Sequence, residues 1–251
     1  MTLLAVDKLE VVYQRAITAV QGVSLAVERG KIVALLGTNG AGKTTTLRAI
    51  SGFLGLDDAR VTEGAISFDG ERIDNLPSHE IVRRGVVQVP GGRGGFPGLT
   101  VAENLRLAAA VSRKDKGKGA GPDLERVFEL FPWLAERRPQ LAGTLSGGQQ
   151  QQLLLARAFL AKPRLIMIDE LSLGLAPIIV EQLLEIVAGL NRDGVTIVIV
   201  EQNVDLALSF SDRAYFLEKG EVRFDGPAAE LRERGDLLRS VFLAGASGAS
   251  L

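Results

Sequence analysis

The sequence predicts an α/β fold built on a buried parallel sheet. Two observations carry this prediction: three apolar runs have the length of strands but no alternation, and stretches with helical spacing follow them. Strands without alternation are buried on both faces, as in a parallel sheet. Strands that alternate with helices are typical of the α/β class. The three runs are residues 31–37, 164–170 and 195–201.

Helices and hairpins are predicted for the rest of this core. Residues 44–54 follow the first strand with helical spacing, 177–190 follow the second, and 203–212 follow the third. Segments 63–73 and 213–226 are predicted instead to be short, hairpin-like strands joined by glycine turns.

The middle of the chain is predicted to be helical. Between residues 101 and 157 we find no convincing strand, and 101–111, 124–138 and 151–161 have the pattern of helices. The glycine-rich stretch 112–122 is predicted to be a mobile, solvated surface loop. Its four cations leave open a second interpretation, in which it binds an acidic partner.

These patterns predict an α/β core that is interrupted by a helical subdomain. We assign residues 1–96 and 157–236 to the core, and 97–156 to the insertion. Residues 237–251 form a C-terminal tail that ends in small residues and is expected to be disordered.

Composition excludes several classes of function. The 29 Lys and Arg residues are balanced by 30 Asp and Glu residues, so the basic excess of a general nucleic-acid-binding protein is missing. The chain has no cysteine, which excludes disulfides and thiol chemistry and is compatible with a reducing compartment. The first residues lack the order of a signal peptide, and no apolar run approaches the roughly 18 residues of a membrane span. Any link to a membrane is therefore expected to go through a partner protein.

A phosphate-binding loop follows the first predicted strand. Residues 37–45, "GTNGAGKTT", fit the pattern G-x-x-x-x-G-K-[ST] in the required context of a strand and a helix. Glycines let backbone N–H groups surround phosphate oxygens, and the helix N-terminus adds positive charge. Lys43 would reach the β- and γ-phosphates and Thr44 would ligate Mg²⁺, whereas the alternative is an ordinary glycine turn. The residues predicted to bind nucleotide here are Asn39, Gly40, Ala41, Gly42, Lys43, Thr44 and Thr45.

Two acidic residues end the second predicted strand. Ligands bind at the carboxyl ends of strands in open α/β sheets. Next to a phosphate loop, Asp169 would hold Mg²⁺ through water, and Glu170 would orient or deprotonate the attacking water. The alternative is a pair of exposed charges without a function.

The stretch "LSGGQ" at 145–149 resembles the signature sequence of ATP-binding cassette (ABC) ATPases. The phosphate loop, helical insertion, signature, acidic strand end and next strand also follow that family's order, so the resemblance spans nearly the whole chain. It implies a P-loop NTPase (RecA-like) core with an N-terminal antiparallel β subdomain and an inserted α-helical subdomain. It also implies that two cassettes meet head to tail, with the signature of one covering the nucleotide of the other.

The resemblance gives roles to the signature residues. Ser146 and the N–H groups of Gly147 and Gly148 would start a helix aimed at the partner's γ-phosphate. Gln149 would lie near that nucleotide or help the helix to start. The rest of the glutamine run, 150–152, is expected to occupy polar positions on the helix surface.

Tyr13 lies ahead of the first predicted strand, where the family has an aromatic residue that stacks on adenine. A π-face suits a base, so we predict stacking, with plain packing as the alternative.

Three segments resemble more narrowly the LivF-type ATPase of bacterial branched-chain amino acid importers. They are residues 89–105, 169–177 and 200–222, and urea-type and short-chain amide importers share much of their pattern.

The chain departs from the family at several positions. Gly91 occupies a place that usually holds a glutamine or glutamate near Mg²⁺ and water. We expect Gly91→Gln to raise activity if the missing side chain limits the attacking water. If it does not, coupling to the membrane subunit has moved elsewhere in this segment, and Arg93 is the first candidate. Gln202 stands where many cassettes have a histidine that contacts the γ-phosphate. Its amide can hydrogen-bond a phosphate but cannot titrate near neutral pH. Ala176 replaces a common aspartate, which suggests unusual communication between the two sites.

The resemblance therefore predicts an ATP- and Mg²⁺-dependent ATPase that powers amino acid import. Its catalytic residues would be Glu170 and Gln202. Expected partners are a second cassette (a homodimer or a LivG-like heterodimer), two membrane permeases and, indirectly, a periplasmic binding protein, but no nucleic acid. The expected location is peripheral, on the cytoplasmic face of the inner (plasma) membrane. The alternatives are a catalytically weak partner of a second cassette and an importer of urea or amides.

Overall fold

The computed structural model describes residues 1–91, 95–111 and 121–233, which form two compact units. Unit 1 consists of Met1–Ile81 and the chain from Thr196 onward, and unit 2 consists of Val82–Val195. Arg93, most of the predicted loop 112–122 and the tail 237–251 lie outside the described residues. The predicted subdomain boundaries stay a prediction.

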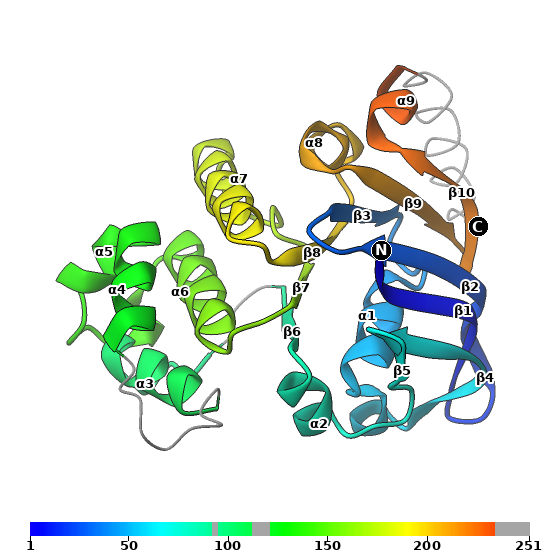
Figure 1. Ribbon diagram of the computed structural model, residues 1–251, viewed down its shortest axis with the longest axis horizontal. Coiled ribbons are helices and arrows are strands. Elements are labelled where there is room, and N and C mark those ends of the chain that lie inside the picture. Colours follow the sequence, from blue (N-terminus) through cyan, green and yellow to red (C-terminus); the bar gives the residue numbers. More distant parts are fainter. Residues whose placement is uncertain (92–94, 112–120, 234–251) are drawn as a thin grey trace, which may run out of the picture. The chain divides into compact units, whose positions relative to one another are not determined.

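Unit 1 contains an antiparallel sheet and a set of mainly parallel strands (Figure 1). The antiparallel sheet has the order β2-β1-β4-β5. In the second set, β3 lies between β8 and β9 and is parallel to both, and β9 pairs with β10 in a hairpin. The strands are β1 (Thr2–Tyr13), β2 (Ile17–Glu28), β3 (Ile32–Gly37), β4 (Ala59–Phe68), β5 (Glu71–Arg72), β8 (Thr196–Glu201), β9 (Arg213–Glu218) and β10 (Glu221–Pro227).

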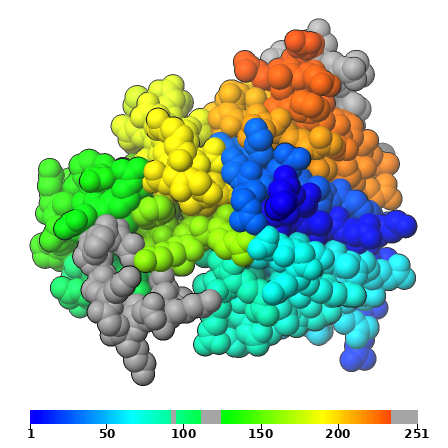
Figure 2. Space-filling model, viewed as in Figure 1, coloured from blue at the N-terminus to red at the C-terminus, as the bar shows by residue number. Residues whose placement is uncertain are grey.

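Strand β3, from the N-terminal part of the chain, pairs with β8 and β9, from the C-terminal part. In Figure 2 the blue N-terminal segment and the orange C-terminal segment accordingly lie against each other. Every residue of β3 and β8 is buried, which confirms the prediction from their unbroken apolar runs. The helices of unit 1 are α1 (Lys43–Ser51), the 3₁₀ turn η1 (Leu54–Asp57), α2 (Ser78–Arg83), which ends two residues beyond the unit, α8 (Val204–Phe210) and α9 (Ala228–Glu233).

Unit 2 contains two parallel strands and most of the longer helices. Strand β6 (Val86–Val89) pairs with β7 (Leu165–Asp169), and Val89 lies opposite Ile168. None of the described residues between 101 and 157 forms a strand, as predicted. In the part of the chain that the structure describes, no helix is long and apolar enough to cross a membrane. The helices are α3 (Val101–Val111), α4 (Gly121–Leu130), α5 (Pro132–Glu136), the 3₁₀ turn η2 (Ala142–Thr144), α6 (Gly147–Leu160) and α7 (Pro177–Arg192).

The structure differs from the local predictions at several places. Tyr13 is not ahead of the first strand, because it ends β1. The helix predicted over 124–138 is broken at Phe131, where Pro132 begins α5: proline lacks the N–H that would continue the preceding helix. Strand β6 was not predicted, because four residues are too few to establish a period.

Candidate functional site

The predicted phosphate loop connects β3 to α1 in unit 1. Gly40 and Gly42 have φ angles of 78° and 98°, in the left-handed region that favours glycine. A Cβ on Gly42 would lie 2.8 Å from the carbonyl oxygen of Ala19, and one on Gly37 would lie 2.3 Å from that of Leu217. The backbone of neighbouring strands therefore requires glycine at both ends of the loop.

Lys43 begins α1 and is only 5% exposed. Its Nζ donates hydrogen bonds to the carbonyl oxygens of Gly37 at 2.8 Å and Thr38 at 2.9 Å. The helix has no side-chain cap at Gly42 and no acidic residue in its first turn. Its N-terminal N–H groups and dipole therefore favour an anion. A buried ammonium next to an uncapped helix N-terminus fits a phosphate group.

Tyr13 is hydrogen-bonded to the same helix, α1. Its hydroxyl and Oγ1 of Thr45 share a hydrogen bond at 3.2 Å. The structure thus brings together two residues that were predicted separately, one for the base and one for the phosphates.

Gln202 leaves the sheet at the same edge as the phosphate loop. It follows β8 directly, and the last residue of β8, Glu201, pairs with Leu36 of the parallel strand β3. The backbone N–H of Gln202 donates to Oε2 of Glu201 at 3.3 Å. Glu201 is only 2% exposed, and sequence analysis missed it. The signal was present, because an acidic residue ends this apolar strand just as Asp169 ends β7.

The acidic pair lies at the carboxyl end of β7 in unit 2. Asp169 is the last residue of the strand and is 7% exposed. Glu170 follows with φ of 48°, an uncommon value for a residue other than glycine. Gly91 comes two residues after the parallel strand β6, so it leaves the sheet at this same edge. The structure therefore brings Gly91 close to the acidic pair.

The signature forms the N-terminus of α6. Ser146 is the N-cap: its Oγ accepts a hydrogen bond from Gln149 N at 3.3 Å, while Oε1 of Gln149 accepts one from Ser146 N at 3.1 Å. This capping box supports the interpretation in which Gln149 helps the helix to start. The N–H groups of Gly147 and Gly148 belong to the first turn, where no carbonyl of the helix can bind them. They are suited to an incoming anion.

The expectation that the remaining glutamines lie on the surface is wrong for two of them. Gln151 is 4% exposed and Gln152 is 8% exposed. The side chain of Gln152 accepts a hydrogen bond from Nε1 of Trp133. The reason is tertiary packing, since α6 contacts α3, α4, α7 and β6.

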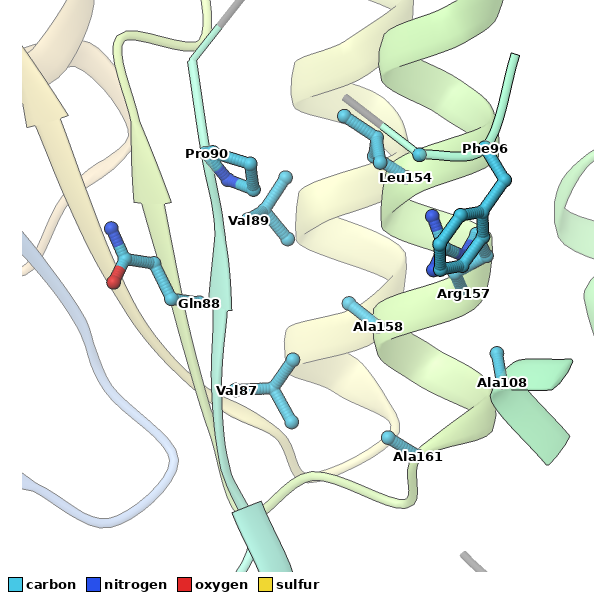
Figure 3. A pocket seen from close by; sticks show the side chains of 11 residues that line it. Val87, Gln88, Val89, Pro90, Phe96, Ala108, Leu154, Arg157, Ala158 and Ala161 are labelled. Atoms are coloured by element: carbon cyan, nitrogen blue, oxygen red, sulfur yellow. The ribbon is translucent and has the colours of Figure 1, made fainter. Parts of the chain in front are cut away.

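A pocket of about 340 Å³ lies in unit 2, between β6 and α6. Val87 and Val89 point toward α6, whereas Gln88 points the other way (Figure 3). The Arg157 guanidinium lies 4.9 Å from the centre of the Phe96 ring, and burial lowers the pKa of this arginine. None of the residues predicted to bind nucleotide lines this pocket.

Comparison with known proteins identifies the family. The sequence profile described as ABC transporter matches residues 20–172, more than half of the chain. The chain belongs to the ABC transporter family. It is an ABC ATPase, and the P-loop NTPase fold predicted from the sequence is confirmed.

Several relatives of this cassette carry names that refer to branched-chain amino acids. It is 44% identical over 229 residues to the high-affinity branched-chain amino acid transport ATP-binding protein BraG of Pseudomonas aeruginosa, covering 91% of this chain and 94% of the relative. It is 37% identical over 208 residues to the probable branched-chain amino acid transport ATP-binding protein LivF of Archaeoglobus fulgidus, covering 82% and 85%.

Solved structures of ABC cassettes match the fold of this one. An ATP-binding subunit of an ABC transporter has a TM-score of 0.80 at 30% identity and covers 97% of this chain and 99% of its own. A dimeric post-hydrolysis state of an ATP-binding cassette, bound to ADP and Pi, has a TM-score of 0.77 at 25% identity and covers 90% and 99%.

The residues of the cassette fit a magnesium nucleotide. Mg²⁺ prefers hard oxygen ligands, such as the Thr44 hydroxyl and the Asp169 carboxylate. Lys43 and the uncapped N-terminus of α1 supply the positive field that a phosphate needs. The roles of the individual residues stay predictions.

Proposed function

We propose that this cassette hydrolyses ATP to power the uptake of branched-chain or related amino acids through two membrane permeases. The observation that supports it most is the 44% identity to BraG over nearly the full length of both chains. The cassette would act peripherally, on the cytoplasmic face of the inner (plasma) membrane, and indirectly serve a periplasmic binding protein.

Each predicted residue has a role in this proposal. Lys43 would bind the phosphates, and Tyr13 would stack on the adenine. Thr44 and Asp169 would hold Mg²⁺, which neutralises phosphate charge when it is bound. Glu170 would take a proton from the attacking water, while Gln202 would hydrogen-bond the γ-phosphate. The remaining predicted nucleotide contacts are Asn39, Gly40, Ala41, Gly42 and Thr45.

A second cassette would complete the site. Ser146, Gly147, Gly148 and Gln149 would contact the nucleotide of a partner that is either a second copy or a LivG-like companion. The solved dimeric cassette that resembles this chain supports a dimer. Gly91 and Gln202 favour a competing function. In it, this chain is catalytically weak and pairs with a second cassette that has the more active site.

Glu170→Gln tests hydrolysis and distinguishes the two functions. The amide cannot accept the proton, so phosphate release should stop while MgATP binding persists, and ATP should trap a dimer on size-exclusion chromatography. Lys43→Ala is the control, because it should lose MgATP binding itself in isothermal titration. Turnover at the wild-type rate in Glu170→Gln would reject Glu170 as the base. A wild-type cassette that binds MgATP but releases no phosphate, alone or with its companion, would support the weak-partner function.

The cargo requires a transport assay. Cells that lack their own importer should take up labelled leucine when they carry the wild-type cassette and its permeases, but not with Lys43→Ala. Uptake of urea or a short amide instead of leucine would show that the importer carries that compound and not branched-chain amino acids.

A further inference from the structure

Gly91 packs directly on the backbone of the acidic pair. A Cβ on Gly91 would lie 2.9 Å from the carbonyl oxygen of Asp169, and 3.5 Å from both the carbonyl carbon of Asp169 and Cβ of Glu170. These contacts are all within unit 2, at the shared edge of β6 and β7. The φ angle of Gly91 lies outside the left-handed region, so its own backbone would accept another residue. The requirement for glycine therefore comes from the neighbouring peptide, which leaves no room for a side chain.

The peptide against which Gly91 packs sets the position of Glu170. The carbonyl of Asp169 and the N–H of Glu170 belong to one rigid peptide plane, and rotation of that plane moves the Cα–Cβ bond of Glu170. Glu170 has φ of 48°, which costs about 1–2 kcal/mol for a residue with a Cβ and persists only where the surroundings enforce it. Two other features support the turn: the side chain of Leu171 is buried, and Leu173 N donates to the carbonyl oxygen of Glu170 at 3.3 Å.

We propose that Gly91 is a positioning residue for Glu170, which acts by close backbone packing on the Asp169–Glu170 peptide. This inference rests on the proposed role of Glu170 in ATP hydrolysis. It reverses the expectation drawn from the sequence, because a glutamine at position 91 would add a Cβ where the Asp169 carbonyl lies. Gly91→Gln should therefore lower activity instead of raising it.

Gly91→Ala and Gly98→Ala form a matched pair that tests this role. Both glycines lie in unit 2 outside the left-handed region, but a Cβ on Gly98 would meet nothing within 4 Å. A new methyl at position 91 must displace the Asp169 carbonyl by a few tenths of an ångström. Since a 1 Å misplacement of reacting groups costs about a hundredfold in rate, kcat should fall roughly tenfold for Gly91→Ala. For Gly98→Ala it should stay at the wild-type value.

The readout separates positioning from a general folding defect. Phosphate release is divided by the number of MgATP-binding sites, which are titrated in the same preparation, so unfolded protein does not count. We expect kcat per site to fall while the MgATP dissociation constant stays within about twofold, because the phosphate loop with Lys43 belongs to unit 1. Wild-type kcat per site in Gly91→Ala would overturn the proposal, as would a loss of affinity that equals the loss of kcat.

A second test combines Gly91→Ala with Glu170→Gln in a double variant. If Gly91 acts through Glu170, adding Gly91→Ala to Glu170→Gln should change the residual phosphate release less than twofold and should still permit ATP-trapped dimers. A further large loss in the double variant would overturn the proposal, because Gly91 would then act through another group. The single variants Glu170→Gln and Gly91→Ala separate the proposed role of Glu170 from the proposed role of Gly91. Full turnover in Glu170→Gln rejects the proposed base and this inference together. Abolished turnover in Glu170→Gln with full turnover in Gly91→Ala rejects this inference alone.

Discussion

Replacing Gly148 by alanine should destabilise the cassette, whereas the same change at Gly147 should not. A Cβ on Gly148 would lie 2.4 Å from Cγ2 of Ile179 on α7, much closer than the roughly 3.5–4.0 Å of an ordinary carbon contact. A Cβ on Gly147 would meet only Cδ2 of Leu175, at 3.5 Å. The two neighbouring glycines of the signature therefore differ in their structural role.

The expected loss of stability for Gly148→Ala is about 1 kcal/mol. Ile179 cannot easily turn away, since a β-branched side chain has one strongly preferred rotamer in a helix. Overpacking by an extra methyl group costs about 1–3 kcal/mol. Removing a glycine from a helix offsets about 0.5–1 kcal/mol of that loss. For a chain of this size, the net loss corresponds to about 2–4 °C in Tm.

Thermal unfolding followed by circular dichroism measures this effect. Ile179→Ala removes the clashing methyl group, so in the Gly148→Ala background it should cost less stability than it costs alone. The reasoning is refuted if Gly148→Ala unfolds at the wild-type temperature, or if the two changes simply add.

Gly147→Ala then isolates the function of the signature. It should unfold at the wild-type temperature or slightly above, because its Cβ makes only an ordinary contact. Phosphate release should nevertheless fall by roughly tenfold or more, since a methyl group at the helix N-terminus would hinder close approach to the partner's nucleotide. Full activity in this variant would argue against the signature's role in the proposed dimer.

Three further changes test other parts of the cassette. Gln202→Ala should slow phosphate release by about tenfold, because one neutral hydrogen bond is worth about 0.5–1.5 kcal/mol, and Gln202→His should be tolerated; an unchanged rate for the alanine variant would mean that Gln202 makes no phosphate contact. Gln152→Leu should lower stability by about 1 kcal/mol and shift the fluorescence of Trp133, the single tryptophan, because the partly buried indole N–H loses its acceptor; an unchanged spectrum would contradict that bond. Burial raises the pKa of the Asp74 carboxyl, but its bonds with Arg72 and a backbone N–H bring the pKa below its usual value. The stability from this lowered pKa is present at neutral pH and is lost as pH falls below about 4, so Asp74→Asn should flatten the acid limb of a denaturation profile, and an unchanged limb would speak against the pair.

Unbroken apolar runs and motif spacing carried most of the fold prediction. Strands β3, β7 and β8 are buried along their whole length, so their pattern needs no tertiary context to be recognised. The pattern of β1 is less regular, because its pairing with both neighbours shifts register beyond Val6 and Asp7, and Lys8 there has φ of 45°. Such a bulge re-aims side chains and breaks the two-residue period.

The site residues were predictable where a sequence motif fixes their chemistry. They were not predictable where tertiary packing determines which side chain fits. The pattern around Lys43 predicted the glycines and the helix start correctly. Sequence could not show that Gly91 and Gly148 are required by the Asp169 carbonyl and by Ile179, since both contacts join residues far apart in the chain. It also could not show that Gln152 is buried, because the packing around α6 and the hydrogen bond from Trp133 depend on residues elsewhere in the chain.

The hydrogen bond between Tyr13 and Thr45 has a consequence for nucleotide selectivity. It fixes the hydroxyl edge of the ring on α1, which leaves the ring face as the part of Tyr13 that a base can use. Every base has a π-face, so stacking tolerates guanine as well as adenine. Discrimination between purines requires donors and acceptors at the base edge, and Tyr13 has its one polar group engaged elsewhere. If stacking dominates base recognition, this ATPase should accept GTP with an affinity close to that for ATP.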